Sequence, residues 1–404
     1  MEKYNYIDLF AGCGGLTDGF EQIGKFEPYA FVEWDKNAFN TLKYRLKTKW
    51  NIKNIDEKAI YFDIQRMEEL LNGFNEDKEY GEHIGLKKLI GKTSIDLIIG
   101  GPPCQAYSIA GRVQDKNGMS CDYRNYLFEN YLKVVKEFQP KLFVFENVQG
   151  ILSAKPNGIN IIERIRDDFE KEGYVIVSDL KKMALLDSSD YGVPQIRKRV
   201  IIIGINKNLT QENPNNILSD FYKNILPSFK VKIKRDVEEA IGDLEPLYPL
   251  ENQERRLSHN NNSNIKNHTP RFHSIRDQEI FSELALDVQN GSIKYPDTDA
   301  LKALYFEKTG KQSSFHKYNV LDFKKQSNTI PAHLYKDGLR HIHPDPKQAR
   351  SITPREAARL QTFDDDFEFL GSQGACYKMI GNAVPPLLSN KIAQAVDILL
   401  QRYF

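Results

Sequence analysis

The chain has 404 residues, 40% of them apolar and 27% charged, which is typical of a globular protein of about two domains. Its net charge of +1 is not that of a strongly basic nucleic-acid-binding protein, and no apolar run approaches the ~18 residues of a membrane span. Four cysteines without C-x-x-C spacing argue against a zinc site or a disulfide framework, so we expect no metal and a cytoplasmic location. The first predicted strand begins near Tyr4, so we also expect no signal peptide.

The first half of the chain alternates short apolar segments with helical patterns. Strands are predicted at residues 4–10, 28–33, 95–99, 141–146, 174–178 and 199–205, and helices at 16–23, 36–47, 124–138 and 159–172. The alternation predicts an α/β fold with a doubly wound, mostly parallel sheet. The charged segment 72–91 is expected to be a surface insertion.

From about residue 207 the pattern becomes irregular, which predicts a second, smaller domain. Residues 206–216 are rich in asparagine and are expected to form a linker, and 258–267 an asparagine-rich loop. A helix is predicted at 354–361, with Thr353 as its N-cap. An amphipathic helix is predicted at about 387–400.

The first strand runs into a glycine-rich turn that contains Gly12 and Gly14. Glycine lets a ligand approach the backbone, and the following helix offers free N–H groups. The turn is not G-x-G-x-x-G, so a dinucleotide is less favoured. It also suits the amino-acid end of S-adenosylmethionine, and the alternative is an ordinary tight turn from strand to helix. Glu33, where the second strand ends, could accept hydrogen bonds from ribose hydroxyls, and Trp34 could stack on adenine.

The turn Gly101-Pro102-Pro103-Cys104 ends another predicted strand abruptly. It holds Cys104 where open α/β sheets place a ligand, which suggests a nucleophile, although a small buried thiol is the commoner fate of a cysteine. Glu146 closes the strand 141–146. It is either a candidate acid or a solvated carboxylate at a strand end.

Together with three later segments, these motifs resemble the DNA (cytosine-5) methyltransferase family of bacterial restriction–modification type. The later segments are Gln195-Ile196-Arg197-Lys198-Arg199-Val200, the run from Arg350 to Gln361, and Gly381-Asn382-Ala383-Val384-Pro385-Pro386. These segments occur in the family's order across nearly the whole chain. Tyr107 stands where the family usually has phenylalanine, which should not affect the chemistry.

The resemblance implies a set of catalytic residues. Cys104 would add to carbon 6 of a cytosine flipped out of double-stranded DNA, and carbon 5 would then take the methyl group. Glu146 would bind ring nitrogen 3 and the exocyclic amine. Arg199 would reach the carbonyl oxygen, and Arg197 would orient the catalytic groups, although both arginines could instead pair within a polar cleft. Residues 108–124 resemble the family's mobile catalytic loop.

The resemblance also implies how S-adenosylmethionine, and its product S-adenosylhomocysteine, would be held. The methionine part would lie against the glycine turn and the adenine against a phenylalanine, with polar contacts from carboxylates and an amide. The residues implied are Phe10, Gly12, Gly14, Glu33 (ribose), Trp34 (stacking), Asp63 (adenine amine) and Asn382 (methionine end).

In the family the last segment returns to the first domain, so residues 1–206 and 371–404 are expected to form a catalytic domain and 207–370 a target-recognition domain. The expected partner is double-stranded DNA. The protein is expected to be a monomer, paired genetically with a cognate restriction endonuclease.

Three groups of residues could line a DNA face or be ordinary solvated surface. They are the basic residues at 230–235, a second basic cluster (Arg255, Arg256, Lys266, Arg271 and Arg276) and seven of the eight histidines. An RNA methyltransferase, a silent binding module and an oxidoreductase are the alternatives. The target sequence does not follow from these residues.

Overall fold

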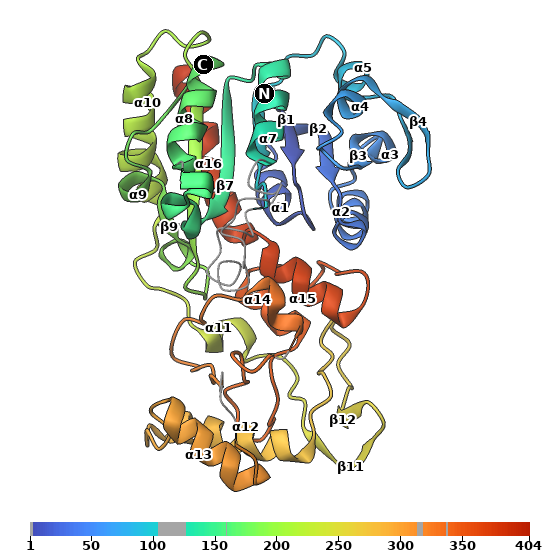
Figure 1. The fold of residues 1–404 in the computed structure, drawn as a ribbon, viewed down its shortest axis with the longest axis vertical. Coiled ribbons are helices and arrows are strands. Elements are labelled where there is room, and N and C mark those ends of the chain that lie inside the picture. The colour runs from blue at the N-terminus through green and yellow to red at the C-terminus, as the bar shows by residue number, and fades with distance from the viewer. Residues whose placement is uncertain (1–2, 104–126, 159, 313–317, 337) are drawn as a thin grey trace. The chain divides into compact units, whose positions relative to one another are not determined.

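The computed structural model describes residues 3–103, 127–158, 160–312, 318–336 and 338–404. Two compact units make up the chain (Figure 1). The sheet unit comprises Met1–Tyr191, Lys198–Val231 and Pro386–Phe404, and the loop-rich unit comprises Gly192–Arg197 and Lys232–Pro385.

An eight-stranded sheet forms the centre of the sheet unit. Its strands are β1 (Tyr4–Leu9), β2 (Phe26–Glu33), β3 (Ala59–Tyr61), β6 (Leu97–Gly100), β7 (Leu142–Val148), β8 (Tyr174–Ile176), β9 (Leu185–Asp187) and β10 (Lys198–Asn206). They follow the order β3-β2-β1-β6-β7-β10-β8, and β9 pairs with β10. The pairs from β3 to β7 are parallel, whereas β10 is antiparallel to its neighbours.

Helices cover both faces of this sheet (Figure 1). On one face, Tyr6 of β1 stacks on Phe20 of α1 (Gly15–Glu21), and α16 (Pro386–Tyr403) packs on α1. On the other, Phe143 of β7 contacts Tyr131 of α7 (Leu127–Phe138) and Phe169 of α8 (Ile161–Lys171). In the parallel register, Tyr6 lies beside Leu97 and Phe143 lies beside Ile98. Neighbouring residues of a strand point to opposite faces, so Tyr6 and Phe143 do as well. The predicted doubly wound, mostly parallel fold is confirmed.

The sheet unit contains further helical segments, most of them short. They are α2 (Lys36–Thr48), α3 (Ile55–Lys58), α4 (Met67–Asn72), α5 (Leu86–Ile90), α9 (Leu180–Met183), α10 (Pro214–Asp220), the 3-10 segments Gln149–Ser153, Pro156–Gly158, Ser188–Tyr191 and Leu226–Phe229, and the π-helical turn Phe221–Ile225. The expected insertion at 72–91 contains a hairpin of β4 (Phe74–Asp77) and β5 (Gly81–His83).

The prediction of a linker at 206–216 is wrong in its second half, because α10 begins there. The Asn213 side chain accepts a hydrogen bond from the Asn215 N–H at 2.9 Å, and Pro214 occupies the first helical position. Asparagine before proline is a helix start as well as a turn signal, since proline lacks only an N–H that the first turn leaves free.

The loop-rich unit has little regular structure. Its elements are α11 (Val237–Ile241), β11 (Pro249–Glu254), β12 (Leu257–His259), α12 (Ile275–Asn290), α13 (Thr298–Thr309), the 3-10 turn η8 (Ala332–Tyr335), α14 (Pro354–Leu360) and α15 (Gln373–Asn382). The predicted helix at 354–361 is α14, and Thr353 and Glu356 form a reciprocal capping box at its start. No helix in the described part of the chain is long and apolar enough to span a membrane.

Candidate active site

The strand order of the sheet unit reverses between β1 and β6. β2 and β3 lie on one side of β1, and β7 lies beyond β6. β1 and β6 are parallel, so the glycine turn after β1 and the proline turn after β6 leave the sheet at the same edge. In open α/β sheets, this switch point is where ligands bind.

Residues at the end of β7 hold the proline turn. The Asn147 side-chain amide donates to the Pro102 carbonyl oxygen at 3.2 Å. A Cβ placed on Gly101 would lie 2.8 Å from Glu146 Oε2, so a larger residue there would displace that carboxylate from its place beside the turn. Cys104 follows in the chain but is outside the described residues, as is the expected catalytic loop 108–124.

Glu146 and Arg199 form an ion pair at this edge, with Arg199 Nε 2.8 Å from Glu146 Oε1. The antiparallel register sets Arg199 opposite Val148 and Ile201 opposite Glu146, which brings the charged side chains together diagonally on one face. Each side chain is only 11% exposed. Burial lowers the pKa of Arg199 while the nearby carboxylate opposes that shift. The ion pair holds the Glu146 carboxylate in place while it stays largely buried from water.

The glycine turn after β1 is joined to the end of β2. The Gly12 N–H donates to Glu33 Oε2 at 2.8 Å, and the Asp35 N–H donates to Glu33 Oε1 at 2.7 Å. Gly14 has a φ of 98°, and a Cβ there would lie 2.8 Å from Leu42, so the turn requires glycine. Glu33 is 6% exposed, and burial raises its pKa to about 7. These contacts place a titratable carboxylate beside the turn.

Three further predicted cofactor residues lie at the same edge of the sheet. Phe10 directly follows β1 with a φ of 57° and is partly buried. Trp34 directly follows β2 and is 50% exposed. Asp63 follows β3 and is partly buried; the neighbouring Phe62 N–H donates to the Glu33 carbonyl oxygen at 3.1 Å, so this segment runs along the end of β2.

Arg197 and Asn382 belong to the loop-rich unit. Arg197 is fully buried and donates to the carbonyl oxygens of Ile330, Gly381 and Ala383, each at 2.9 Å. The structure therefore gives Arg197 a bracing role among backbone segments, unlike Arg199 two residues later. Asn382 ends α15 and is exposed.

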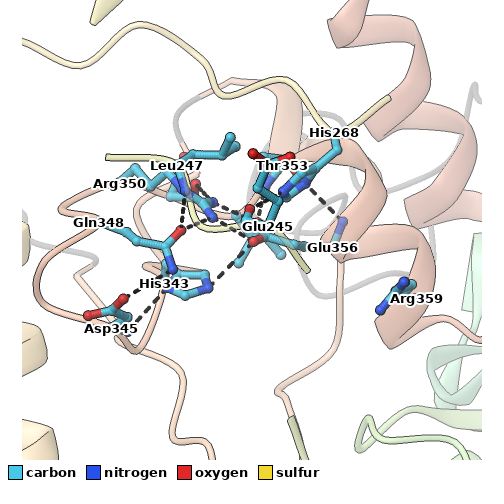
Figure 2. A network of polar contacts seen from close by, with 12 residues as sticks. Glu245, Leu247, His268, His343, Asp345, Gln348, Arg350, Thr353, Glu356 and Arg359 are labelled. Carbon is cyan, nitrogen blue, oxygen red and sulfur yellow. Dashed lines mark hydrogen bonds and ion pairs between the residues drawn. The ribbon is translucent and has the colours of Figure 1, made fainter. Parts of the chain in front are cut away.

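Most of the histidines of residues 259–343 are buried, so they do not line a surface. His259, His268, His273, His341 and His343 are each at most 5% exposed. His343 lies 3.4 Å from Glu356 in a buried network that also holds Arg350, 2.6 Å from the same carboxylate (Figure 2). Burial lowers the pKa of His343 to about 3, so its role is that of a neutral hydrogen-bonding group.

The basic residues of these two clusters differ in how exposed they are. Residues 230–234 are exposed, as are Arg255, Arg256, Lys266 and Arg276, so these remain candidates for contact with DNA phosphates. Arg271 is instead partly buried and donates to the Leu334 carbonyl oxygen at 2.9 Å.

Sequence reasoning missed Asn147, whose amide anchors the proline turn. The available signal was an asparagine directly after Glu146, within an otherwise apolar strand whose interior must pair every polar group.

The sheet order, the glycine turn and the buried carboxylate–guanidinium pair define the class of doubly wound, ligand-binding α/β enzymes. Within that class, the chain belongs to the C-5 cytosine-specific DNA methylase family, whose profile matches residues 4–397. It is thus an enzyme of the DNA (cytosine-5) methyltransferase type, and the resemblance drawn from its motifs is confirmed.

Several known proteins are similar to the chain along nearly its whole length. A type II methyltransferase of Bacillus paralicheniformis is 35% identical, covering 96% of this chain and 98% of the relative. A type II methyltransferase of Haemophilus parahaemolyticus is 31% identical, covering 97% and 86%. A prophage-encoded DNA modification methyltransferase from E. coli superposes with a TM-score of 0.65 at 25% identity, covering 99% of this chain and 100% of that one.

Proposed function

We propose that the chain methylates carbon 5 of a cytosine within a short, specific sequence of double-stranded DNA, as the modification enzyme of a type II restriction–modification system. The observation that carries the proposal is the buried Glu146–Arg199 pair beside the proline turn. The full-length similarity to type II methyltransferases supports the biological setting. In that setting we propose a cytoplasmic monomer that protects DNA from a cognate endonuclease.

The residues around the glycine turn fit S-adenosylmethionine. Among the described residues other than its chain neighbours, no heavy atom lies within 4 Å of where a Cβ on Gly12 would be, which leaves room for a ligand against the backbone. Glu33 can accept from ribose hydroxyls, Trp34 and Phe10 offer ring faces for adenine, and Asp63 offers an acceptor for its amine. Gly14 and Asn382 are proposed to lie near the methionine part. When bound, S-adenosylmethionine supplies the methyl group.

The chain's own residues would prepare the base. Cys104, as a thiolate, adds to carbon 6 and breaks the aromaticity of the ring, which makes carbon 5 nucleophilic. Glu146 hydrogen-bonds to nitrogen 3 and the exocyclic amine, and Arg199 neutralises charge at the carbonyl oxygen. After carbon 5 is methylated, its proton leaves, the bond to sulfur breaks and the thiolate is regenerated.

We propose that Arg197 acts at a distance from the base, by bracing the backbone that precedes β10. The target cytosine must leave the duplex for this chemistry, at a cost of a few kcal/mol. We propose that residues 1–206 and 371–404 form the catalytic domain and residues 207–370 the target-recognition domain.

Trapping on 5-fluorocytosine DNA tests the reaction. The last step needs loss of a proton from carbon 5, and a fluorine at that position cannot be lost in its place. The adduct with Cys104 should therefore persist as a denaturant-resistant protein–DNA complex that requires the methyl donor. The same duplex with ordinary cytosine should give no stable complex. Absence of the adduct under conditions where the fluorinated duplex binds would refute the covalent mechanism.

Binding of S-adenosylhomocysteine should weaken as the pH falls through 7. Ribose hydroxyls need the ionised Glu33 carboxylate, whose pKa of about 7 means that protonation removes acceptors below that pH. Linkage then predicts a dissociation constant about tenfold higher at pH 6 than at pH 8, measured by titration calorimetry. Glu33→Gln should bind weakly with no such pH dependence. A wild-type constant that does not change between pH 6 and 8 would contradict the role of Glu33.

A further inference from the structure

Two loops of the loop-rich unit, residues 268–274 and 331–336, are fastened together by one side chain. Arg271 donates to the carbonyl oxygens of Leu334 at 2.9 Å and Tyr335 at 3.5 Å. Its guanidinium also lies over the ring of Tyr377 in α15, 4.7 Å from the centroid. Both loops are therefore held against the same helix.

Buried histidines fix the first loop on either side of Arg271. His268 is 1% exposed; its Nδ1 lies 3.0 Å from Thr353 Oγ1 and its Nε2 2.9 Å from the Glu245 carbonyl oxygen (Figure 2). His273 is 5% exposed and its Nε2 accepts from the Ser351 N–H at 3.2 Å. Inward side chains at 268, 271 and 273 therefore set the loop's conformation before any partner binds.

The second loop is fixed by close backbone packing. A Cβ on Gly381 of α15 would lie 2.4 Å from the Ala332 nitrogen, so glycine is required for this approach. Just before the loop, the Ile330 carbonyl oxygen accepts from Arg197 at 2.9 Å. A bulkier residue at 381 would push the loop away from the helix.

What these fixed loops present to solvent is aromatic and basic. Phe272 is 47% and Tyr335 is 44% exposed, and Lys336 Nζ lies 6.0 Å from the Tyr335 ring centroid. Thr269 and His333 are also exposed. The first segment, residues 268–274, contains no aspartate or glutamate. We call Thr269, Phe272, His333, Tyr335 and Lys336 the recognition patch.

Exposed rings beside cations on a rigid backbone are suited to nucleic acid. In a duplex groove, apolar ring atoms can pack on thymine methyl groups, which distinguishes base pairs, and a lysine neutralises phosphate. A preformed loop also loses little conformational entropy when DNA binds.

We propose that the recognition patch contacts the target DNA, with Phe272 and Tyr335 against the bases and Lys336 at a phosphate. Phe272 and Tyr335 thereby determine the enzyme's sequence preference. This proposal rests on the proposed function, because it assumes that the substrate is duplex DNA.

The test compares Phe272→Ala and Tyr335→Ala with Phe306→Ala, which removes a ring 53% exposed on α13 of the same unit. Probes are a duplex carrying the motif that the wild-type enzyme methylates and a scrambled duplex of equal composition. Each patch variant should raise the dissociation constant for the motif duplex about tenfold and reduce its preference over the scrambled duplex. Phe306→Ala should match wild type in both respects.

Leucine variants at 272 and 335 separate loss of the ring from a folding defect, because leucine keeps the bulk of the side chain without a ring. They should show the same loss while binding S-adenosylhomocysteine as wild type does. Lys336→Gln should weaken both duplexes equally and lower the slope of log K against log salt by about one.

Wild-type affinity and preference in the alanine and leucine variants, with wild-type methylation intact, would overturn the recognition patch alone. A wild-type enzyme that methylates RNA rather than any DNA duplex would instead refute the proposed function, and the patch with it.

Discussion

Replacing Cys104 with alanine should abolish methyl transfer while leaving DNA binding intact. Alanine removes the sulfur that would add to carbon 6, and no other group can make carbon 5 nucleophilic by that route. We expect the turnover number to fall by at least about four orders of magnitude, as when other enzymes lose their nucleophile. Transfer of radiolabelled methyl groups and a gel-shift titration measure the two properties separately.

The matched control is Cys376→Ala, at a free cysteine of α15 to which no motif assigns a role. It should methylate DNA at the wild-type rate. If Cys104→Ala loses DNA binding together with activity, Cys104 serves the structure of the protein. If Cys104→Ala retains activity, it is not the nucleophile.

Replacing Glu146 with glutamine should be the next most damaging change. Glutamine keeps an acceptor for Arg199 Nε, so the edge of the sheet should remain folded, but the negative charge that stabilises the attacked base is lost. A loss of about 10²- to 10⁴-fold in turnover is expected, the range for removal of a positioned acid or base. Steady-state kinetics should show this in kcat, with little change in affinity for S-adenosylhomocysteine.

Arg199→Met removes the other partner of the pair and should behave differently. It leaves Glu146 buried without its cation, so it should lower the free energy of unfolding by up to about 3–5 kcal/mol as well as the activity. Glu170→Gln, at an exposed position on α8, is the control and should be neutral. Equal stability of Arg199→Met and wild type would mean that solvent compensates Glu146.

The sheet and its edge could be predicted because local signals agree there. The predicted strands at 28–33, 95–99 and 141–146 are largely apolar and end at or just before a glycine or a carboxylate, and parallel strands bring such ends to one edge. Glu33 and Glu146 were found in this way. The contact between Gly101 and Glu146 depends on the register of β6 and β7, which residue types do not encode locally.

The loop-rich unit was harder to predict because its order comes from long-range polar contacts. His268 and Arg271 look like surface residues in the sequence, yet each has a hydrogen-bond partner more than 60 positions away, Thr353 for His268 and Leu334 for Arg271. Arg197 and Arg199 are nearly adjacent in sequence, but β10 begins between them, so only Arg199 takes its direction from the sheet. Hydrophobic periodicity carries no information about such contacts.

The most direct measurement is bisulfite sequencing of DNA from a methylation-free bacterial host that expresses the chain, beside the same host expressing Cys104→Ala. We expect protected cytosines at one position of a single short motif, absent from the Cys104→Ala culture. Unprotected DNA from cells that contain folded, S-adenosylhomocysteine-binding enzyme would contradict a sequence-specific DNA cytosine-5 methyltransferase.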